Sequence, residues 1–407
     1  MKCRFCSKNL TYTFLDLGFA PPSNAYLGAE DLSRPEKYFP LRVKVCDYCW
    51  LVQTEDYAEA DQLFRDDYAY FSSTSSSWLK HASKYVEDII REVGLSRESL
   101  VIEIASNDGY LLKNFVAAGI PCLGIEPTKS TADAAEQLGV PVVREFFGEV
   151  LGERLASENR KADLIIGNNV YAHVPDINSF TRGLKLALKP GGTITLEFPH
   201  LLQLIKFAQF DTVYHEHFSY LSLYTVERIF RAAGLRVWDV AKLDTHGGSL
   251  RVYGCHEGED RKIRDAVHNC IVEESDAGLR ELSTYDGFQA RVDSIKDTFL
   301  AFLIESKSAG KTVAAYGAAA KGNTLLNYAG VKPDLLPFVC DMAVIKKGKF
   351  MPGSHIPIYS PKVLDQKPPD YLVILPWNIA EEIIRQYGSL ARSGTRFVTA
   401  VPWLEVK

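Results

Sequence analysis

Short β-branched apolar runs alternate with stretches of helical periodicity along most of the chain. An apolar run at 100–104 ends in small and polar residues, and an apolar-periodic segment at 110–118 follows at once, which predicts a strand, a tight turn and a helix. Apolar runs at 122–125 and 162–167 continue the pattern, so we expect a parallel sheet with helices between its strands. Further elements of this sheet are expected at 78–93 (helix), 189–192 (turn), 193–198 (strand), 225–233 (helix), 235–240 (strand) and 245–253 (glycine-containing turn and strand).

The same alternation starts again after about residue 260. An amphipathic helix is predicted at 287–309, and strands at 312–317, 336–340 and 371–375 would form a second Rossmann-like sheet. The first 75 residues instead hold two apolar segments, 11–17 and 38–45, which we expect to be strands of a separate module. The pattern thus predicts an α/β protein of three parts, with boundaries at 1–75, 76–245 and 246–407.

Composition narrows the class of protein. The chain of 407 residues is 46% hydrophobic and 24% charged, which is ordinary for folded globular domains and excludes wholesale disorder. Its net charge of −5 gives no electrostatic reason to expect nucleic acid or an anionic membrane as a partner. The start of the chain shows no apolar signal region, and no segment has the length of a membrane span. We therefore expect a cytoplasmic protein.

Four of the eight cysteines form two C-x-x-C pairs. Cys3 with Cys6, and Cys46 with Cys49, can offer four thiolates to a tetrahedral Zn²⁺. The set is closed by four sulfur ligands, so we expect structural zinc rather than catalytic zinc. The four dispersed cysteines are expected to be small buried residues.

The strand at 100–104 leads to a candidate nucleoside site. Glu126 follows the next predicted strand, where an acidic residue can accept both ribose hydroxyls of a bound nucleoside. The turn lacks G-x-G-x-x-G, so a dinucleotide pyrophosphate has no cradle. The turn from Glu103 to Gly109 resembles motif I of the class I S-adenosylmethionine-dependent methyltransferases, with Ala105 at the position of the usual first glycine. The alternative is a β-α-β unit without a ligand.

Two polar stretches would border this crevice. The segment 66–78 is dense in aromatic and hydroxyl side chains, and it is either a solvated linker or, as we favour, a pocket wall. Asn168 and Asn169 follow the strand at 162–167 and could hold the methionine or adenosine portion of the cofactor. His173 could do the same, but it could equally be a capping or core histidine.

The run Tyr214-His215-Glu216-His217 concentrates acid, base and hydrogen-bond donors. H-x-H could ligate a metal, but no third ligand of helical spacing follows, and H-E-H is not H-E-x-x-H. A polar surface turn is the structural alternative. In an extended segment Tyr214 would face away from His217, so a loop or helix start is required if both serve one site.

A second anion-binding turn is predicted in the C-terminal part. Gly317, Ala318 and Ala319 are small enough for backbone amides to approach an anion, and the turn contains Lys321. A phosphate or diphosphate fits such a turn. The basic loop 346–349 is either a solvated face or lies near the same strand ends, and His246 and Arg251 either reach the crevice or belong to a plain strand and turn.

Over essentially its whole length the chain resembles the C-methyltransferases that act on nucleotide-linked 4-keto-deoxyhexoses. The most specific parts are Y-H-E-H-F-S-Y at 214–220 and Y-G-A-A-A-K-G at 316–322. The resemblance implies S-adenosylmethionine in the middle domain and a nucleotide-diphosphate sugar as substrate, with monomers or small oligomers. It implies that His217 removes the proton beside the ketone, that Glu216 orients its neighbours, and that the resulting carbon nucleophile attacks the S-methyl group. His215 stays open as a competing base.

The residues expected to act in each role are as follows. Catalysis is assigned to His217, Glu216, Tyr214 and Tyr68. Cofactor binding is assigned to Glu103, Ala105, Ser106, Asn107, Asp108, Gly109, Tyr110, Leu111, Glu126, Pro127, Asn168, Asn169 and His173. Substrate binding is assigned to Tyr70, Ser72, His246, Arg251, Gly317, Ala318, Ala319, Lys321, Asn323, Lys349 and His355. Two other classes remain possible, an O- or N-methyltransferase on a small polar substrate and a non-catalytic zinc-containing nucleotide-binding protein.

Overall fold

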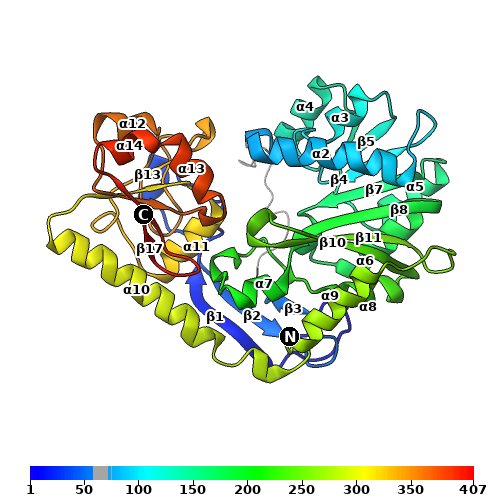
Figure 1. Cartoon of the computed structure of the whole chain (residues 1–407), viewed down its shortest axis with the longest axis horizontal. Helices are drawn as coiled ribbons and strands as arrows, with labels where there is room; N and C mark the ends of the chain where they lie inside the picture. Colours follow the sequence, from blue (N-terminus) through cyan, green and yellow to red (C-terminus); the bar gives the residue numbers. More distant parts are fainter. Residues whose placement is uncertain (58–71, 75) are drawn as a thin grey trace.

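The protein is seen here in a computed structural model that describes residues 1–57, 72–74 and 76–407. The strands of these residues form three β-sheets, one for each predicted part (Figure 1). Within the described residues no helix is both long and apolar enough to cross a lipid bilayer. The predicted α/β fold of three parts is confirmed.

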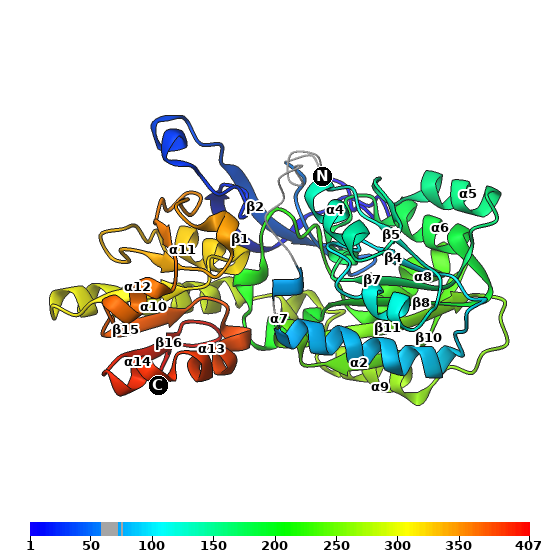
Figure 2. The same ribbon diagram turned by 90° about the horizontal axis from the view of Figure 1, so that it is seen from above.

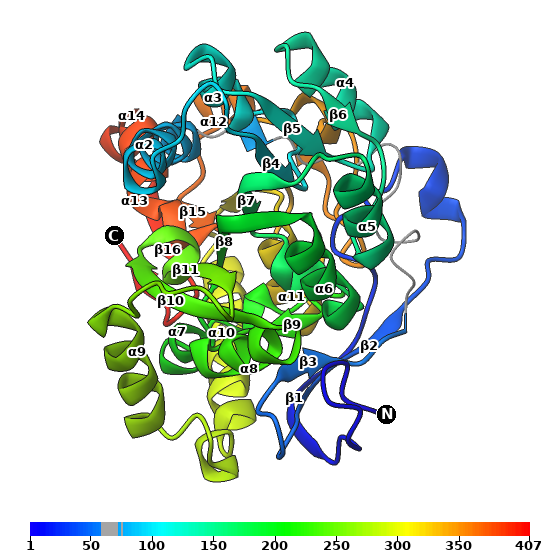
Figure 3. The same ribbon diagram turned by 90° about the vertical axis from the view of Figure 1, so that its right-hand side faces the viewer.

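The N-terminal sheet is antiparallel, in the order β1-β2-β3-β9. Its strands are β1 (Tyr12–Ala20), β2 (Phe39–Val45), β3 (Val52–Thr54) and β9 (Ser219–Tyr220). The first two match the predicted strands. The last comes from the middle of the chain, and Figure 3 shows it beside β3. The N-terminal sheet is therefore completed by a segment that directly follows the Tyr214–His217 run.

The middle sheet has the order β10-β11-β8-β7-β4-β5-β6. β4 to β8 run parallel, and β11 joins antiparallel to β8 and β10. The strands are β4 (Val101–Ile104), β5 (Cys122–Ile125), β6 (Val142–Val143), β7 (Ala162–Asn168), β8 (Leu188–Pro199), β10 (Leu235–Leu243) and β11 (Ser249–His256). The helices of this part are α2 (Ser76–Val93), α3 (Leu112–Ala117), α4 (Lys129–Gln137), α5 (Glu149–Ser157), α6 (Ile177–Ala187), α7 (Leu201–Lys206), α8 (Leu223–Ala232) and α9 (Asp265–Asp276).

Both faces of the middle sheet are buried, which explains why its parallel strands are continuous apolar runs. Val101 packs with α2 and α3 on one face, while Ile102 and Ile104 pack with α5, α6 and α8 on the other. Two predicted boundaries need correction. β11 lies in this sheet, so the middle part extends beyond residue 245. The predicted turn at 189–192 lies within β8, which already begins at Leu188.

The C-terminal sheet has the order β14-β13-β12-β15-β16-β17 and is parallel except for β17. Its strands are β12 (Val313–Tyr316), β13 (Val339–Cys340), β14 (Ile358–Tyr359), β15 (Tyr371–Ile374), β16 (Arg396–Thr399) and β17 (Glu405–Val406). Its helices are α10 (Phe288–Ser308), α11 (Ala320–Tyr328), α12 (Lys362–Gln366), α13 (Ala380–Gln386) and α14 (Gly388–Arg392). β13 is shorter than predicted, and α11 begins at Ala320, so Lys321 lies in the first helical turn rather than in the preceding turn.

The N-terminal hairpin lies between the two α/β parts and contacts both. In Figure 2 the C-terminal and middle parts stand on opposite sides, with β1 and β2 running between them. Phe14 of β1 packs on Tyr285 and Phe288, with ring centroids 5.2 and 4.5 Å away. One continuous apolar core joins β1 and β2 to α10, α11 and α7. This packing brings the N-terminal part into contact with both α/β parts.

Candidate active site and metal centre

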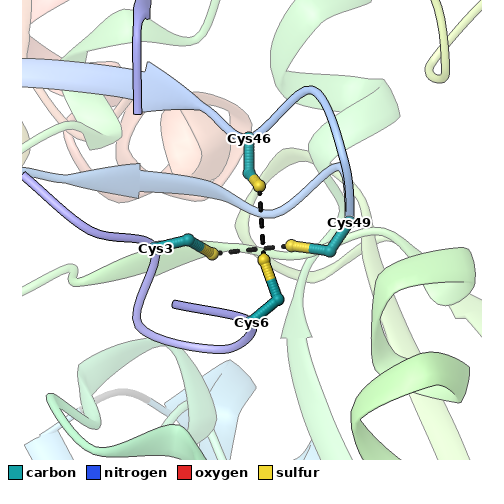
Figure 4. A group of neighbouring side chains, drawn as sticks. All are labelled: Cys3, Cys6, Cys46 and Cys49. Atoms are coloured by element: carbon teal, nitrogen blue, oxygen red, sulfur yellow. Dashed lines mark hydrogen bonds between the residues drawn. The ribbon is translucent and has the colours of Figure 1, made fainter. Parts of the chain in front are cut away.

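The four predicted metal ligands, Cys3, Cys6, Cys46 and Cys49, converge (Figure 4). Their sulfur atoms all lie within 4.8 Å of one another, with separations of 3.5 Å for Cys3–Cys49 and for Cys6–Cys46. A tetrahedral Zn²⁺ with Zn–S bonds of about 2.3 Å has sulfur atoms roughly 3.8 Å apart, so the set fits this ion with little adjustment. All four positions would be filled by sulfur, as in structural zinc sites.

The metal centre is connected to the segment that carries the candidate catalytic residues. Gln53 donates from its side chain to the sulfur of Cys3 at 3.2 Å, and its backbone pairs with Ser219 of β9. Thr54 donates from its backbone to Phe218 and from its hydroxyl to the carbonyl of His217, both at 3.1 Å. The zinc module therefore holds the backbone at and just after His217.

The turn after β4 contains three residues in the left-handed conformation. Ala105, Asn107 and Gly109 have φ values of +55°, +50° and +74°. A Cβ on Gly109 would come within 3.1 Å of Ala135, so this position needs glycine for space as well as for conformation. Ala105 adopts the left-handed conformation without glycine, and the backbone of the turn is retained.

Buried acceptors line the ends of β4 and β5. One carboxylate oxygen of Glu103 and one of Asp108, and the hydroxyl of Ser106, have no hydrogen-bond partner among the described residues. Burial first, and then the charges of Asp108 and Glu126, raise the pKa of Glu103 well above its ordinary value. Glu126 accepts from the backbone N–H groups of Asn107 and Thr128 at 2.9 and 3.0 Å. Because these atoms are acceptors in a buried site, they suit a cationic ligand that donates hydrogen bonds, and S-adenosylmethionine, a sulfonium with an ammonium group and ribose hydroxyls, is such a ligand.

The neighbouring strand end adds polar groups to the same crevice. Both side-chain polar atoms of Asn168 are buried and unpartnered within the described parts of the chain. Asn169 donates to Nε2 of His246 at 3.1 Å. Trp78 stacks on Tyr110 and meets His246 edge-on, with centroids 6.1 and 5.4 Å apart. The predicted cofactor residues of the two strand ends are thus brought together, with Leu111 buried at the start of α3 and Pro127 directly after Glu126.

His217 and Tyr214 form the central pair of the candidate catalytic site. Nδ1 of His217 lies 2.7 Å from the carbonyl oxygen of Thr212, and Nε2 lies 2.7 Å from the Tyr214 hydroxyl. A carbonyl can only accept, so Nδ1 carries the proton and Nε2 accepts from Tyr214. The backbone N–H of His217 bonds to the carbonyl of Tyr214 at 2.9 Å. This turn, which follows η4 (Phe210–Thr212), places the two side chains together, as the sequence required.

The surroundings keep His217 neutral. Burial is the main cause that lowers its pKa well below the ordinary value, and the neighbouring His173 and Lys321 act in the same direction. The rings of His173 and His217 lie 4.5 Å apart, edge to face. His215 faces elsewhere: it lies 3.3 Å from the carbonyl of Pro40 and its ring meets Phe39 of β2. The competing histidine is therefore turned toward the N-terminal sheet.

The C-terminal part contributes a cation to this crevice. Lys321 lies over the ring of Trp377 at 4.8 Å and donates to Asn378 at 3.3 Å. Trp377 in turn donates to Asp211 at 2.7 Å. Burial raises the pKa of Asp211 to about 6, against the effect of Lys321. Burial first, and then the same lysine, lower the pKa of His246 to about 4. Lys321 is thus close to the catalytic candidates.

Several predicted substrate residues are engaged by the protein instead. Arg251 pairs with Glu197 at 2.7 Å and lies over the ring of Tyr85 at 4.2 Å. Burial alone would raise the pKa of Glu197, but His81 and Arg251 outweigh it and lower this pKa to about 2. The backbone N–H of Ser72 donates to Asn107 of the cofactor turn at 2.9 Å. Arg251 is therefore held by residues of the middle domain, and Ser72 lies beside the candidate cofactor turn.

The predicted anion turn of the C-terminal part is likewise covered. The carbonyl of Ala318 accepts from the Tyr26 hydroxyl at 2.6 Å and from Lys346 at 2.7 Å. Asn323 donates to the carbonyl of Ser23 at 2.6 Å. A Cβ on Gly317 would come within 2.4 Å of Pro376. Packing against this proline therefore accounts for the glycine, and no bound anion is needed to explain it.

Two further predicted substrate residues lie in the loop after β13, and Ala319 is the N-cap residue of α11. His355 pairs with Glu36 of the N-terminal part at 2.9 Å, so it is used at a contact between parts of the chain. The backbone of Lys349 donates a hydrogen bond to Lys346 and accepts one from Ile358. The next residue, Phe350, pairs through its backbone with Leu27 of the N-terminal part. Tyr68 and Tyr70 lie outside the described residues.

Sequence reasoning missed the contribution of the N-terminal segment 21–27. Asn24 donates to the carboxylate of Glu216 at 3.1 Å. No motif or periodicity marks this asparagine, which lies in an irregular segment far from residue 216 in the chain.

Comparison with known proteins agrees with this arrangement. C-methyltransferase NovU of Streptomyces niveus is 37% identical over 401 residues, which cover 98% of this chain and 95% of that protein. The chain belongs to the C-methyltransferase family. Family models match in the order of the parts: "Putative zinc binding domain" at 3–64, "Methyltransferase domain" at 78–240 and "C-methyltransferase C-terminal domain" at 244–402. The predicted enzyme class and the predicted cofactors, S-adenosylmethionine and zinc, are confirmed.

Solved structures with a similar arrangement are more distant. An S-adenosylmethionine-dependent methyltransferase from Clostridium acetobutylicum is 13% identical, with a TM-score of 0.35, and the match covers 44% of this chain and 92% of that one. The magnesium protoporphyrin IX methyltransferase of Synechocystis, solved with S-adenosylhomocysteine, is 14% identical with a TM-score of 0.34, over 43% of this chain and 82% of that one.

Proposed function

We propose that this C-methyltransferase methylates a nucleotide-linked 4-keto-deoxy sugar at the carbon next to the ketone. One observation carries the proposal: His217 is a buried neutral imidazole whose Nδ1 donates to Thr212 and whose unprotonated Nε2 accepts from the Tyr214 hydroxyl. Carbon is a poor nucleophile unless a proton is first removed from it. A positioned base of this kind supplies that step.

The tautomer of His217 suits proton removal. The carbonyl of Thr212 keeps the proton on Nδ1 and orients the ring, and it can stabilise the imidazolium that forms when Nε2 takes a proton. A hydrogen beside a ketone is acidic enough for imidazole only if the enolate oxygen is stabilised as it forms. Tyr214 provides a hydroxyl donor next to the base, and Lys321 provides positive charge in the same crevice.

The proposed cofactor site is the end of β4 and β5. The acceptors of Glu103, Ser106 and Asp108 would hold the polar groups of the methionine portion, and Glu126 would accept from the ribose. Asn168 and Asn169 would border the other side. When bound, S-adenosylmethionine supplies an electrophilic methyl group. The residues of this site bind and orient it, and Trp78 with Tyr110 reduces the access of water.

A sugar carried on a nucleoside diphosphate fits the charge of the crevice. Lys321 of α11 lies over Trp377, and its charge acts on His217 and His246. S-adenosylmethionine has no phosphate that would need this lysine. We therefore assign Lys321 to the diphosphate side of the substrate, and His246 to the sugar side.

The test is incubation with ¹³C-methyl-labelled S-adenosylmethionine and a nucleotide-linked 4-keto-deoxyhexose, followed by NMR of the product. A methyl group on a ring carbon next to the ketone is the expected result. The wild type should also exchange that ring hydrogen for deuterium when S-adenosylhomocysteine replaces the methyl donor, because proton removal precedes methyl transfer. A methyl group on oxygen or nitrogen would overturn the proposal in favour of an O- or N-methyltransferase.

A further inference from the structure

The N-terminal segment 21–27 forms a wall of the crevice and is fixed at several points. Ser23 is held through its carbonyl by Asn323, and Tyr26 through its hydroxyl by Ala318, each at 2.6 Å. Leu27 pairs through its backbone with Phe350. Asn24 lies between these contacts and turns its side chain to Glu216. The segment belongs to the part of the chain that carries the zinc ligands.

Glu216 is almost fully buried and depends on few donors. Its side chain is 1% exposed, and one carboxylate oxygen accepts from Nδ2 of Asn24 at 3.1 Å. The other oxygen has no partner in the ranges that the structure describes. The backbone N–H groups of Asn24 and of Glu216 itself also act on the carboxylate. Among these contacts, Asn24 is therefore the one residue outside the 214–217 run that donates to the Glu216 carboxylate.

We propose that Asn24 is a positioning residue of the methyl transfer reaction, which holds Glu216 as an oriented carboxylate and leaves its second oxygen to accept a hydrogen bond from the substrate. This inference rests on the proposed function, since it gives Glu216 a task at the sugar. It also makes the zinc-binding part of the chain a contributor to the reaction centre rather than a separate module.

The electrostatics of the site support this role. Burial raises the pKa of Glu216, and the donors from its own backbone and from Asn24 oppose that rise. The titratable groups that feel its charge are Tyr26 of the same wall and Tyr220 of β9, and burial raises the pKa of both. His173 faces Glu216 through the backbone carbonyl, and its own pKa is lowered by burial to about 4. Among the described residues no cation contributes to the shift of Glu216, so its ionisation depends on the donors of its own backbone and of Asn24.

The first test measures the ionisation of Glu216 directly. Infrared difference spectra between the full-length zinc-loaded protein and its Glu216→Gln variant isolate the carboxyl band of Glu216 as the pH is varied. In Asn24→Ala the titration midpoint should rise by about one to two pH units, because a hydrogen bond to a charged group is lost. An unchanged midpoint overturns the inference whether or not the sugar substrate is right.

The second test measures the reaction with a nucleotide-linked 4-keto-deoxyhexose that the wild type methylates. Asn24→Ala should lower kcat about 10- to 100-fold with KM nearly unchanged, and its pH profile should shift upward together with the titration midpoint of Glu216. Asn24→Asp places two carboxylates together, and these share one proton that replaces the amide donor. Its kcat should be near that of the wild type at low pH and fall as the pH rises and the shared proton is lost.

The matched control is Asn9→Asp, the same chemical change at an exposed position of the same part of the chain. It should leave kcat, its pH profile and the zinc content unchanged. Equal losses in Asn24→Ala and Asn24→Asp with the wild-type pH profile would assign Asn24 a merely structural role. If the wild type methylates no such sugar, the proposed function fails, and the infrared titration still decides the role of Asn24.

Discussion

In both α/β domains the first strand of the sheet lies between two parallel neighbours and runs into a helix. β4 lies between β5 and β7, and β12 lies between β13 and β15. At the end of β4, Glu103, Ser106 and Asp108 keep polar atoms without partners among the described residues. At the end of β12 the carbonyl of Ala318 and the amide nitrogen of Asn323 bind the N-terminal segment.

Sheet topology therefore sets where a ligand can bind, but the polar groups left free at that position decide whether one does. The polar groups after β4 stay available, so a small molecule can satisfy them. Those after β12 are largely satisfied by another part of the same chain. Two groups differ: the side-chain oxygen of Asn323 has no partner among the described residues, and the charge of Lys321 acts on His217. The C-terminal sheet end thus acts mainly as a docking platform for the segment that reaches Glu216.

The largest effect is expected from His217→Asn, because this change removes the proposed catalytic base. Methyl transfer and deuterium exchange should both fall by roughly 10²–10⁴-fold, with both ligands still bound in calorimetry. His215→Asn is the matched control and should keep most of both activities, because His215 faces β2. An inactive His215 variant beside an active His217 variant would exchange their roles.

The buried histidines of the crevice predict a pH dependence of stability. Burial lowers the pKa of His173 and of His246 to about 4, so the unfolded chain binds more protons than the folded one between about pH 4 and the ordinary value near 6.5. The free energy of unfolding should be level above that window and fall by roughly 1.4 kcal/mol per pH unit for each histidine as the pH drops through it. Denaturant unfolding at several pH values measures this slope. The double variant His173→Asn, His246→Asn should lose the share of these two residues, while His217, whose pKa burial also lowers, keeps its own share.

Glu126 and Asp341 occupy matching positions, since each directly follows the strand beside the first strand of its sheet. Glu126→Ala should weaken S-adenosylhomocysteine binding by about 1.5–3 kcal/mol, the range for hydrogen bonds to a charged group. Asp341→Ala should leave this affinity unchanged. Calorimetry on both variants decides the point, and equal losses would remove the distinction between the two sheet ends.

Lys321→Ala should raise KM for the nucleotide sugar by about tenfold, because a charge-assisted contact to phosphate is lost. Cofactor affinity should not change. Lys347→Ala, at an exposed position of the basic loop, is the control. If kcat falls instead of KM rising, Lys321 stabilises the enolate rather than binding the diphosphate.

The smallest effect is expected from Asn323→Ala. Loss of its bond to Ser23 should lower the free energy of unfolding by about 1 kcal/mol. It should leave cofactor affinity unaltered, as measured by denaturant unfolding and calorimetry. A selective rise in KM without a loss of stability would restore Asn323 to the substrate site.

Much of this arrangement could be predicted from the sequence because it is local. Apolar runs mark β4, β5 and β7, the C-x-x-C spacing marks the metal site, and the dense polar run marks Tyr214 and His217. Periodicity does not reveal which polar groups the protein itself occupies. Arg251 and Asn323 are residue types that often contact ligands. In the folded protein, however, Arg251 pairs with Glu197, and Asn323 donates to the carbonyl of Ser23. A strand of two residues such as β9 is too short to show an alternation of apolar and polar positions. Asn24 meets Glu216 only in the tertiary fold.

The pairing of β3 with β9 has a consequence for how the chain reaches its native state. Val52 and Gln53 pair with Tyr220 and Ser219, so the edge of the N-terminal sheet stays open until the middle domain has been synthesised. Contacts of such long sequence separation form late and slowly. The zinc knuckles and the hairpin β1–β2 can assemble early on the ribosome, but the loop that holds His217 is fixed only when β9 docks. Docking of β9 therefore closes the N-terminal sheet and fixes the loop that holds His217 in the same step.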